Sequence, residues 1–281
     1  MGWGDYIMTS GVVRRLKKLE PDTQIIINEP YNNTFFYKNI FYQNPYITHI
    51  SDFDLSKPYT KIDRLLTGDI DPNKNCINWH KERVAETGNF YPTAMEISNG
   101  KEVFNKIYSN WKLINKKHPK GIIFISNNLK LEEDVNGKII KNNRVINKNW
   151  GINNWSRLIK ICAPDYIMIN TSSDKNNNEE LEGLYSVICD FRTTYSIMSH
   201  CDYFIGSEGG LHHLWATNKK QGVVIFGHWI PPYLTGYPYH INISPNDAKH
   251  CGRLEECEEC TNYLRHLSVD YVKSLIDENF K

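Results

Sequence analysis

The sequence lacks several features that would assign it to common protein classes. No uninterrupted apolar run approaches the roughly 20 residues that cross a bilayer. An excess of charge of one sign is also absent, because 33 Lys and Arg residues stand against 32 Asp and Glu residues. A near-neutral chain has no broad electric field to attract nucleic acid or an anionic membrane. These absences favour a protein that binds a small, locally charged ligand and not a nucleic acid.

The sequence also lacks a secretory leader and an even set of cysteines. Residues 1–5 (MGWGD) do not show the basic-then-apolar layout of a signal peptide. Seven cysteines are scattered between Cys76 and Cys260, which fits a reducing compartment better than a disulfide framework. We therefore expect a cytoplasmic protein without a transmembrane segment. Its 281 residues, 40% of them hydrophobic, are enough for two globular domains.

Hydrophobic patterns along the chain predict alternating helices and strands. After a glycine loop at 2–5, a helix is expected, followed by a β-branched strand at 24–28. Later strands are predicted at 122–125, 166–170, 203–206 and 222–227, and helices at 100–117, 155–162, 193–200 and 209–217. Alternating strands and helices predict an α/β protein with parallel sheets and ligands at the carboxyl ends of the strands. A linker composition near His118 places the boundary between domains 1–118 and 119–281.

The most informative segment follows the predicted strand at 203–206. It reads Ser207-Glu208-Gly209-Gly210-Leu211-His212-His213 and opens a predicted helix. Glycines at a helix start expose N–H groups that can hold a diphosphate. The carboxylate can accept hydrogen bonds from sugar hydroxyls, and the imidazoles can donate to phosphate oxygens. The alternative is a tight strand-to-helix turn in which Glu208 caps the helix.

This segment resembles glycosyltransferase family 9, the heptosyltransferase family. Its members carry an acidic residue followed by Ser/Thr/Gly-Gly-x-x-His at a strand end, and then a strand that ends in Phe-Gly. Here the strand is VVIFG at 223–227, and Pro231-Pro232 with TGY at 235–237 resembles a Pro-containing loop of the family. The form Glu-Gly-Gly-Leu-His-His is similar to a subgroup related to ADP-heptose transferases. Typical heptosyltransferases have Asp-Thr or Asp-Ser in place of Glu208-Gly209, so the donor sugar stays open.

The resemblance implies a GT-B fold of two Rossmann-like domains and an inverting transfer that needs no metal. The amino-terminal domain would bind a glycan or lipopolysaccharide-type acceptor, and peripheral contact with a membrane is left open. The carboxyl-terminal domain would bind an ADP-heptose-like nucleotide sugar. The donor-binding residues implied by the resemblance are Lys148, Glu208, Gly209, Gly210, Leu211, His212 and His213.

The lysine in this set belongs to a second matching motif. Lys148 lies two residues before Trp150, and Trp155 follows at the start of an apolar helix. Family members place a Lys just before Trp in this loop, where it contacts the donor phosphates. An ammonium there would offset the negative charge that grows on the leaving nucleoside diphosphate. The alternative is a solvated lysine among many.

The start of the chain supplies the candidate catalytic base. Gly4-Asp5 followed by Ile7 and Thr9 resembles the family's Gly-Asp-x-(Leu/Ile)-x-(Thr/Ala) loop, whose Asp is the proposed base. A carboxylate facing the cleft would take the proton from the acceptor hydroxyl. An ordinary helix-capping role for Asp5 is the alternative. The strand that precedes this loop in the family is missing from the sequence, so the start lies too far downstream or the domain lacks a central strand.

A cysteine cluster near the carboxyl end is a candidate metal site. Cys251, Cys257 and Cys260 are spaced C-x5-C-x2-C, with His250 beside them. Three thiolates could hold structural zinc or iron with a fourth ligand, and free thiols are the alternative. Some family 9 relatives that glycosylate proteins carry a cysteine-bound iron. Such a metal would brace the loop after Gly236 and take no part in the transfer.

Two rival functions remain open at this level. A nucleotide-sugar 2-epimerase shares the GT-B architecture and a similar ligand, but needs acid and base groups around the donor's own sugar. A degenerate, non-catalytic relative that is retained for binding is the second rival, and the missing first strand motivates it. One local prediction concerns a helix start. Thr193 is expected to cap the helix that begins beside Arg192.

Overall fold

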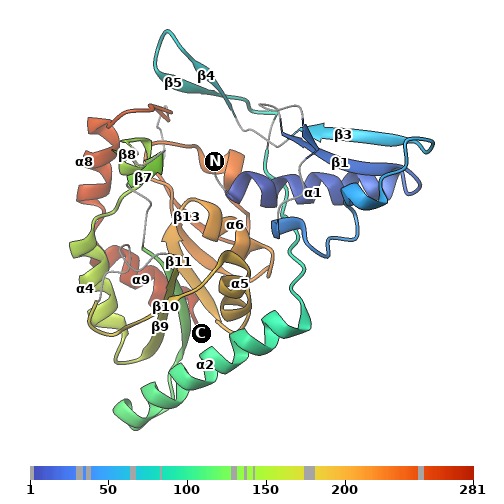
Figure 1. The fold of residues 1–281 in the computed structure, drawn as a ribbon. Helices are drawn as coiled ribbons and strands as arrows, with labels where there is room; N and C mark the ends of the chain where they lie inside the picture. The colour runs from blue at the N-terminus through green and yellow to red at the C-terminus, as the bar shows by residue number, and fades with distance from the viewer. Residues whose placement is uncertain are drawn as a thin grey trace.

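The computed structural model shows an α/β protein with an extended amino-terminal part beside a larger parallel sheet (Figure 1). It describes residues 3–29, 34–35, 39–63, 68–82, 84–127, 132–135, 138–141, 143–173, 181–245 and 250–281. Gly2 of the predicted glycine loop lies outside these ranges.

The amino-terminal part is built from one long helix and a small sheet. Its elements are α1 (Trp3–Leu19), β1 (Gln24–Glu29), β2 (Thr34–Phe35), the 3-10 turns η1 (Asn39–Phe41) and η2 (Ile50–Asp52), β3 (Tyr59–Asp63), and the hairpin β4 (Gly68–Asp71) and β5 (Cys76–Trp79). The sheet order is β2-β1-β3, with β1 and β3 parallel. Helix α1 and strand β1 confirm the helix predicted near the start of the chain and the β-branched strand predicted at 24–28.

The carboxyl-terminal part contains six parallel strands in the order β10-β9-β6-β11-β12-β13. The strands are β6 (Gly121–Ser126), β9 (Tyr166–Ser172), β10 (Leu184–Ile188), β11 (Tyr203–Ser207), β12 (Gly222–Ile225) and β13 (Ile241–Ile243). The other elements are α2 (Ala94–Asn115), the hairpin β7 (Glu132–Val135) and β8 (Lys138–Lys141), α3 (Asn143–Ile146), α4 (Ile152–Cys162), α5 (Phe191–Ser199), α6 (Gly210–Ala216), α7 (Pro232–Thr235), α8 (Glu258–His266) and α9 (Val269–Asn279). From β6 the chain adds β9 and then β10, which forms one edge of the sheet. It then crosses back to add β11 on the other side of β6, followed by β12 and the second edge strand, β13.

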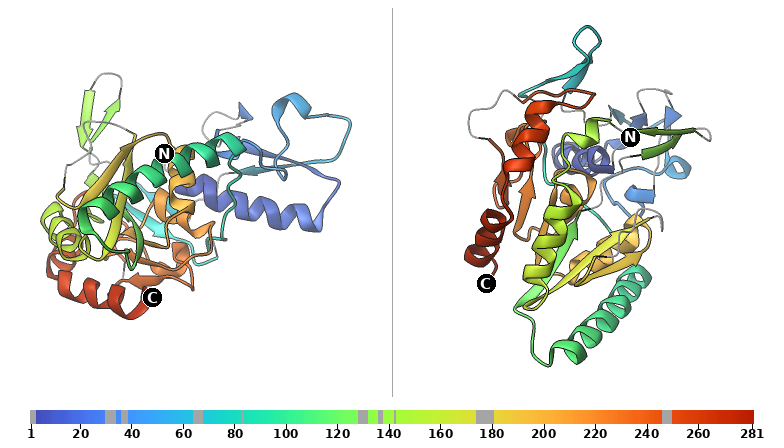
Figure 2. Two further views of the ribbon diagram at one scale, coloured as in Figure 1. Left: turned by 90° about the horizontal axis from the view of Figure 1, so that it is seen from below. Right: turned by 90° about the vertical axis from the view of Figure 1, so that its left-hand side faces the viewer.

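Helices cover both faces of this sheet because its buried strands are apolar on both sides. Phe124 of β6 packs in one hydrophobic cluster, and the neighbouring Ile123 and Ile125 pack in another. Side chains that alternate along a strand point to opposite faces, which explains the split. The first cluster also contains residues of α1, α5 and α6, and the second contains residues of α4, α8 and α9. The two views of Figure 2 show α2 and the red carboxyl-terminal helix on opposite sides of the sheet.

The amino-terminal elements pack directly on the carboxyl-terminal part. Helix α1 lies against α6, and α2 lies against α5. Both contacts need glycine, because a Cβ at Gly4 would lie 2.5 Å from Cδ2 of His213, and one at Gly100 would lie 2.4 Å from Cβ of Ser196. Helix α2 therefore precedes the predicted boundary at 118/119 in sequence but packs on an element that follows it. The division into domains 1–118 and 119–281 stays a prediction.

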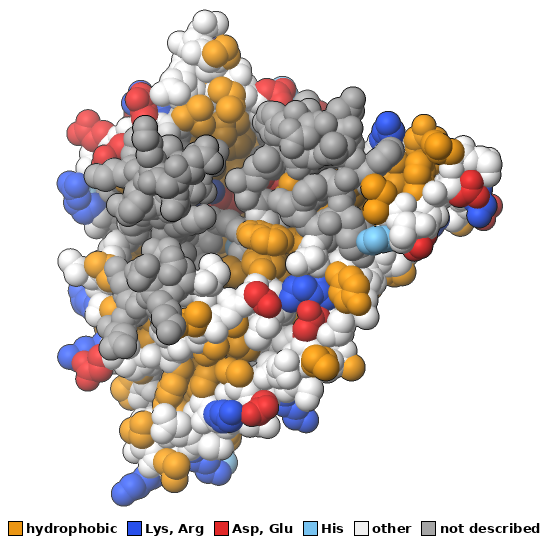
Figure 3. Space-filling view, viewed as in Figure 1, with side chains coloured by type: hydrophobic (Ala, Val, Ile, Leu, Met, Phe, Trp, Pro, Cys, Tyr) orange, Lys and Arg blue, Asp and Glu red, His pale blue; other side chains and the backbone are white. Residues whose placement is uncertain are grey.

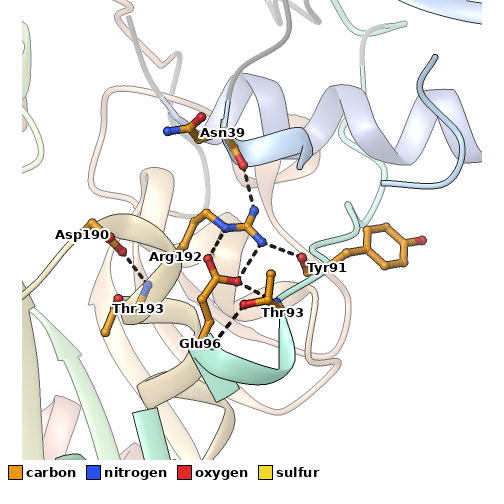
Figure 4. Close-up of polar contacts among 7 residues, drawn as sticks. All are labelled: Asn39, Tyr91, Thr93, Glu96, Asp190, Arg192 and Thr193. Atoms are coloured by element: carbon orange, nitrogen blue, oxygen red, sulfur yellow. Dashed lines mark hydrogen bonds and ion pairs between the residues drawn. The ribbon is translucent and has the colours of Figure 1, made fainter. Parts of the chain in front are cut away.

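Arg192 at the start of α5 joins segments from both parts (Figure 4). Its guanidinium donates to both carboxylate oxygens of Glu96, at 2.6 and 2.9 Å, and to the backbone oxygens of Asn39 and Tyr91, each at 2.7 Å. This arginine holds the pKa of Glu96 below its usual range. A planar guanidinium that donates hydrogen bonds to three segments at once fixes their relative positions.

Two local predictions about helix starts were wrong. Trp3 and Asp5 belong to α1 and not to a glycine loop, so the helix begins earlier than the pattern predicts. Asp190 caps α5, because its carboxylate accepts from the Thr193 N–H at 2.7 Å (Figure 4). Thr193 therefore lies inside the helix. An Asp three residues before a helical amide is the stronger cap by its own chemistry.

The surface carries mixed charge. On the face drawn in Figure 3, the described Lys and Arg side chains are interspersed with Asp and Glu side chains and do not gather in one patch of a single sign. No helix within the described ranges combines the length and the apolar character needed to cross a membrane.

Candidate functional site at the switch point of the parallel sheet

The predicted glycine-histidine segment lies where the sheet topology changes direction. Strands β6 and β11 are neighbours, although β9 and β10 come between them in the chain. Such a switch point leaves a crevice at the carboxyl ends of the strands, where ligands bind in open α/β sheets. Ser207 is the last residue of β11 and is followed at once by Glu208, whose N–H donates to the Ile225 carbonyl at 3.0 Å. The segment is therefore anchored at this edge by its own backbone.

Helix α6 begins at Gly210 without a side-chain cap. Gly209 is its N-cap residue, so the hypothesis that Glu208 caps the helix is wrong. The helix has seven residues, Gly210–Ala216, and is shorter than the predicted 209–217. First-turn amides have no intrahelical acceptor, and among the residues that the structure describes no side chain caps them either. A Cβ at Gly209 would meet no described atom within 4 Å, so there is open space beside this N-cap residue.

The Glu208 carboxylate forms a buried ion pair with the Lys148 ammonium. The Glu208 side chain is 5% exposed and that of Lys148 is 14% exposed, so the hypothesis of a solvated lysine is wrong. The ammonium also lies 4.2 Å from the centre of the Trp229 ring. Burial by itself would raise the pKa of Glu208, but the charge of Lys148 and the hydrogen bond from His213 outweigh it and hold the pKa well below its usual range. The carboxylate is therefore ionised in a site largely closed to water.

His213 is held between a carboxylate and a phenol. Its Nε2 lies 3.5 Å from Oε1 of Glu208, and its Nδ1 lies 2.8 Å from the hydroxyl of Tyr237. Burial raises the pKa of Tyr237, so the phenol keeps its proton and can donate it to Nδ1. A carboxylate can only accept, and the Tyr237 hydroxyl can donate to Nδ1, so the two partners favour a proton on Nε2. Two buried partners thus set the direction in which His213 donates.

His212 points into the protein interior. It is fully buried, with its ring 5.2 Å from Tyr237 and 5.3 Å from His240, centre to centre. Neither of its ring nitrogens has a hydrogen-bond partner among the described residues. Burial, aided by His213 and His240, lowers the pKa of His212 well below its usual range, so the ring is neutral. Leu211 is partly buried and packs against the same core. Donor-binding roles for these two residues stay a prediction.

Asp5 is brought to the edge of this site by the packing of α1. It lies in the first turn of the helix and is partly buried. The preceding Gly4 touches the ring of His213, and Trp3 lies beside Gly210. The start of α1 and the start of α6 therefore meet, which places the candidate base next to the candidate donor segment. Its catalytic role stays a prediction.

The three cysteines of the predicted metal site are together. The sulfur atoms of Cys251, Cys257 and Cys260 all lie within 4.8 Å of one another, and those of Cys251 and Cys260 are 3.3 Å apart. A hydrogen bond from Cys260 lowers the pKa of Cys251 to about 6. Zinc–sulfur bonds of about 2.3 Å require such spacing among tetrahedral ligands. His250 is turned toward Ser244, with its Nε2 3.0 Å from the hydroxyl.

Three residues of the site were missed by the sequence reasoning or given no role in it. Asn147 lies directly before Lys148 and is fully buried, Trp229 supports the ammonium, and Tyr237 positions His213. Tyr237 was visible only as part of the Thr-Gly-Tyr motif. No pattern of spacing marks the other two, because their partners lie far away in the sequence.

The architecture matches solved glycosyltransferase structures. The crystal structure of the glycosyl transferase family 9 from Veillonella parvula DSM 2008 aligns with 100% of this chain and 95% of that chain, at a TM-score of 0.61 and 13% identity. The chain has the GT-B fold of family 9. The iron-containing dodecameric glycosyltransferase TibC from enterotoxigenic E. coli H10407 aligns with 99% of this chain and covers 76% of TibC, with the same TM-score at 12% identity.

Two further comparisons involve bound ligands. TibC in complex with ADP-D-beta-D-heptose aligns with 92% of this chain and 78% of that chain, at a TM-score of 0.53 and 12% identity. The match to the E. coli heptosyltransferase WaaC with ADP-2-deoxy-2-fluoro heptose spans 57% of this chain and 44% of WaaC, at a TM-score of 0.38 and 14% identity. No protein-family model and no curated protein sequence matches the chain. The assignment to a Glu-Gly-Gly-Leu-His-His subgroup stays a prediction.

Proposed function

We propose that this protein is an inverting glycosyltransferase that moves a sugar from a nucleoside-diphosphate sugar to a glycan or lipopolysaccharide-type acceptor. The observation that carries the proposal is the buried group of Lys148, Glu208 and His213 at the switch point of a GT-B sheet. An apolar pair would pack at that edge as well as this buried ion pair does. Packing alone therefore does not account for the two charges. Its chemistry suits a diphosphate and a sugar.

The donor would bind with its diphosphate near Lys148 and the first turn of α6. An ammonium has three donors, and Glu208 uses one of them, so the rest can face phosphate oxygens. The uncapped first-turn amides of α6, which begins at Gly210, would add donors. Glu208 has acceptor capacity left for sugar hydroxyls. Because these groups are already in place, they stabilise charge that develops on the leaving diphosphate without rearrangement.

The transfer would proceed by direct displacement. The acceptor hydroxyl attacks the anomeric carbon while Asp5 takes its proton, and the bond from that carbon to the diphosphate oxygen breaks. The electron pair leaves with the diphosphate, whose charge the Lys148 ammonium offsets, and His213 acts through its contact with Glu208. Attack from the face opposite the leaving group inverts the anomeric configuration. The step needs no metal.

The donor base and sugar are proposed from a structural neighbour. TibC, solved in complex with ADP-D-beta-D-heptose, shares the fold, so ADP-heptose is the first donor to test. The proposal also assigns acceptor binding to domain 1–118 and donor binding to domain 119–281. A cytoplasmic location and peripheral contact with a membrane stay predictions.

The cysteine cluster would hold a structural metal in this protein. Its three close sulfur atoms, two of them on buried residues, fit zinc or iron, and the fold neighbour TibC is iron-containing. The metal would stabilise the loop that carries the cysteines and supply no step of the transfer. One further ligand would complete a tetrahedral site.

Thermal stabilisation by nucleotides tests the donor site. A ligand that binds only the folded state raises the melting temperature with its concentration. We expect one nucleoside diphosphate, ADP first, to stabilise the wild type much more than the Lys148→Ala variant at the same nucleotide concentration. Lys160→Ala is the matched control, because Lys160 forms an exposed ion pair with Glu182. If none of ADP, UDP, GDP and CDP stabilises the wild type, the proposal is wrong.

Turnover separates the transferase from its two rivals. A transferase releases the nucleoside diphosphate from a nucleotide sugar in proportion to acceptor that is glycosylated. An epimerase would convert the nucleotide sugar at the same rate without any acceptor. Binding of the nucleotide sugar with no turnover under either condition would instead support a degenerate, non-catalytic protein.

A further inference from the structure

The cysteine loop, residues 250–260, is tied to the donor-site lysine through Asn147. The Asn147 amide nitrogen donates to the carbonyl oxygens of Arg253 at 3.2 Å and Glu255 at 2.8 Å. Its amide oxygen accepts from the N–H of Cys257 at 2.8 Å. The side chain is fully buried, and more than 100 sequence positions separate it from each partner. The side-chain amide of Asn147 therefore forms hydrogen bonds to three residues of the loop, and Asn147 is the residue that directly precedes Lys148.

Trp229 provides a second connection to the same loop. Its indole N–H donates to the Arg253 carbonyl at 2.7 Å, so this oxygen accepts from both Trp229 and Asn147. The face of the same ring lies 4.2 Å from the Lys148 ammonium. The indole is 7% exposed and packs edge-on against Trp79. A shift of the Arg253 carbonyl would therefore reach Lys148 by two routes. Asn147 would transmit it to the Lys148 backbone, and Trp229 would transmit it to the ammonium.

The backbone of Lys148 is fixed from the sheet side as well. Ser207 donates its hydroxyl to the Lys148 carbonyl at 3.1 Å, and the Lys148 N–H donates to Val145 at 3.0 Å. Glu208 then holds the far end of the side chain. Lys148 is therefore enclosed between the end of β11 and the cysteine loop. A change in the loop when the cysteines gain or lose a bound metal would reach Lys148 through Asn147 and Trp229.

We infer that Asn147 and Trp229 are positioning residues that make the placement of the Lys148 ammonium depend on the conformation of the cysteine loop. This inference rests on the proposed role of Lys148 in binding the donor diphosphate. The loop that carries the three thiols thereby acts on the donor site through Asn147 and Trp229. The loop with its sulfur atoms ordered presents the Arg253 carbonyl to both residues, and a disordered loop would release them.

Nucleotide affinity tests the link. We expect Asn147→Ala to weaken ADP binding by about tenfold, as coupled neighbours commonly do. Trp229→Phe keeps a ring beneath the ammonium but loses the indole donor, so it should weaken binding to a smaller extent. Asn154→Ala is the matched control, because Asn154 donates to the Trp150 carbonyl at 2.8 Å in the same segment but not to the cysteine loop. It should bind ADP like the wild type.

A double-mutant cycle separates positioning from a general loss of structure. If Asn147 acts through Lys148, then Asn147→Ala should have almost no further effect on ADP affinity in a Lys148→Ala background. Equal losses in both backgrounds would overturn the inference. Metal content per chain, measured on each variant, should stay unchanged in Trp229→Phe, so that its lower affinity reports the link and not a lost metal.

The Lys148 ammonium can be observed without any nucleotide. Its ¹⁵Nζ resonance, assigned by its loss in Lys148→Gln, should be sharp in the wild type and in Asn154→Ala because the group is buried and paired. Asn147→Ala should shift or broaden it, and so should removal of the metal by a chelator. An unchanged resonance in Asn147→Ala would overturn the inference, whatever the fate of the proposed transferase function.

Discussion

Lys148 and Glu208, which are 60 positions apart in the sequence, form a buried ion pair at the point where β11 ends. His213 adds a second hydrogen-bond donor near the carboxylate. Removing two charges from water costs several kcal/mol per ion unless each is well paired. The site is therefore stable only while its charges match, and a diphosphate donor would enter a site whose donors are already arranged around one anion.

Glu208→Gln should destabilise the protein and flatten its acid unfolding profile. The variant leaves the Lys148 ammonium buried without its counter-charge, which costs about 3–5 kcal/mol at neutral pH. Because the folded pKa of Glu208 is depressed, its contribution is fully present above the unfolded value of about 4.3 and is lost as the pH falls below it. Urea unfolding from pH 7 down to pH 3 measures this. Glu182→Gln, in an exposed pair, should follow the wild type throughout. A similar pH slope in Glu208→Gln would contradict the assignment.

Tyr237→Phe should release the tautomer of His213. In the wild type the phenol donates to Nδ1 and leaves the proton on Nε2, so the ¹⁵N shifts of His213 should show that tautomer. Without the hydroxyl, Nδ1 is buried without a partner, at a cost of roughly 1–3 kcal/mol. Tyr239→Phe is the control, since that hydroxyl donates to the Ala216 carbonyl instead. A wild-type ring protonated on Nδ1 would refute the prediction.

Asp5→Asn should abolish transfer while leaving donor binding intact. An amide cannot take the proton from the acceptor hydroxyl, and a general base contributes about 10²- to 10⁴-fold to the rate. The first turn of α1 still tolerates an Asn, so the fold should persist. Steady-state kinetics should show a lower kcat, and calorimetry should show an unchanged affinity for ADP. A nearly normal kcat in Asp5→Asn would show that Asp5 is not the general base and only occupies the start of α1.

Cys257→Ser should remove the metal from the protein. We expect one zinc or iron per chain in the wild type and none in Cys257→Ser, measured by elemental analysis after exhaustive dialysis. The variant should also melt at a lower temperature, because metal binding contributes to folding. Cys189→Ser, at a partly buried cysteine outside the cluster, is the control. A metal-free wild type that takes up neither ion on reconstitution would leave only free thiols.

Local patterns predicted the elements that form the middle of the large sheet. Strands β6, β9, β11 and β12 are buried apolar runs of four to seven residues, and each was expected near its observed place. The edge strands β10 and β13 were missed. The first is only partly buried and the second has three residues, so neither carries a clear period. Helix α9 was not assigned, although Val272 and Ile276 lie on its buried face at helical spacing.

The sequence by itself determined the glycine- and histidine-rich composition of the site and its place after a strand. The Gly209-Gly210 pair and the lysine-tryptophan spacing are local features that a reader can find without coordinates. Only the tertiary structure decided which groups meet. The segment before α4 returns to the end of β11, where Ser207 donates to the Lys148 carbonyl and Glu208 pairs with the Lys148 ammonium. The close approach of Gly4 to His213 brings the start of α1, with Asp5 in its first turn, to the start of α6. These contacts arise from burial of apolar faces shared by distant segments, and such faces leave no record in local spacing.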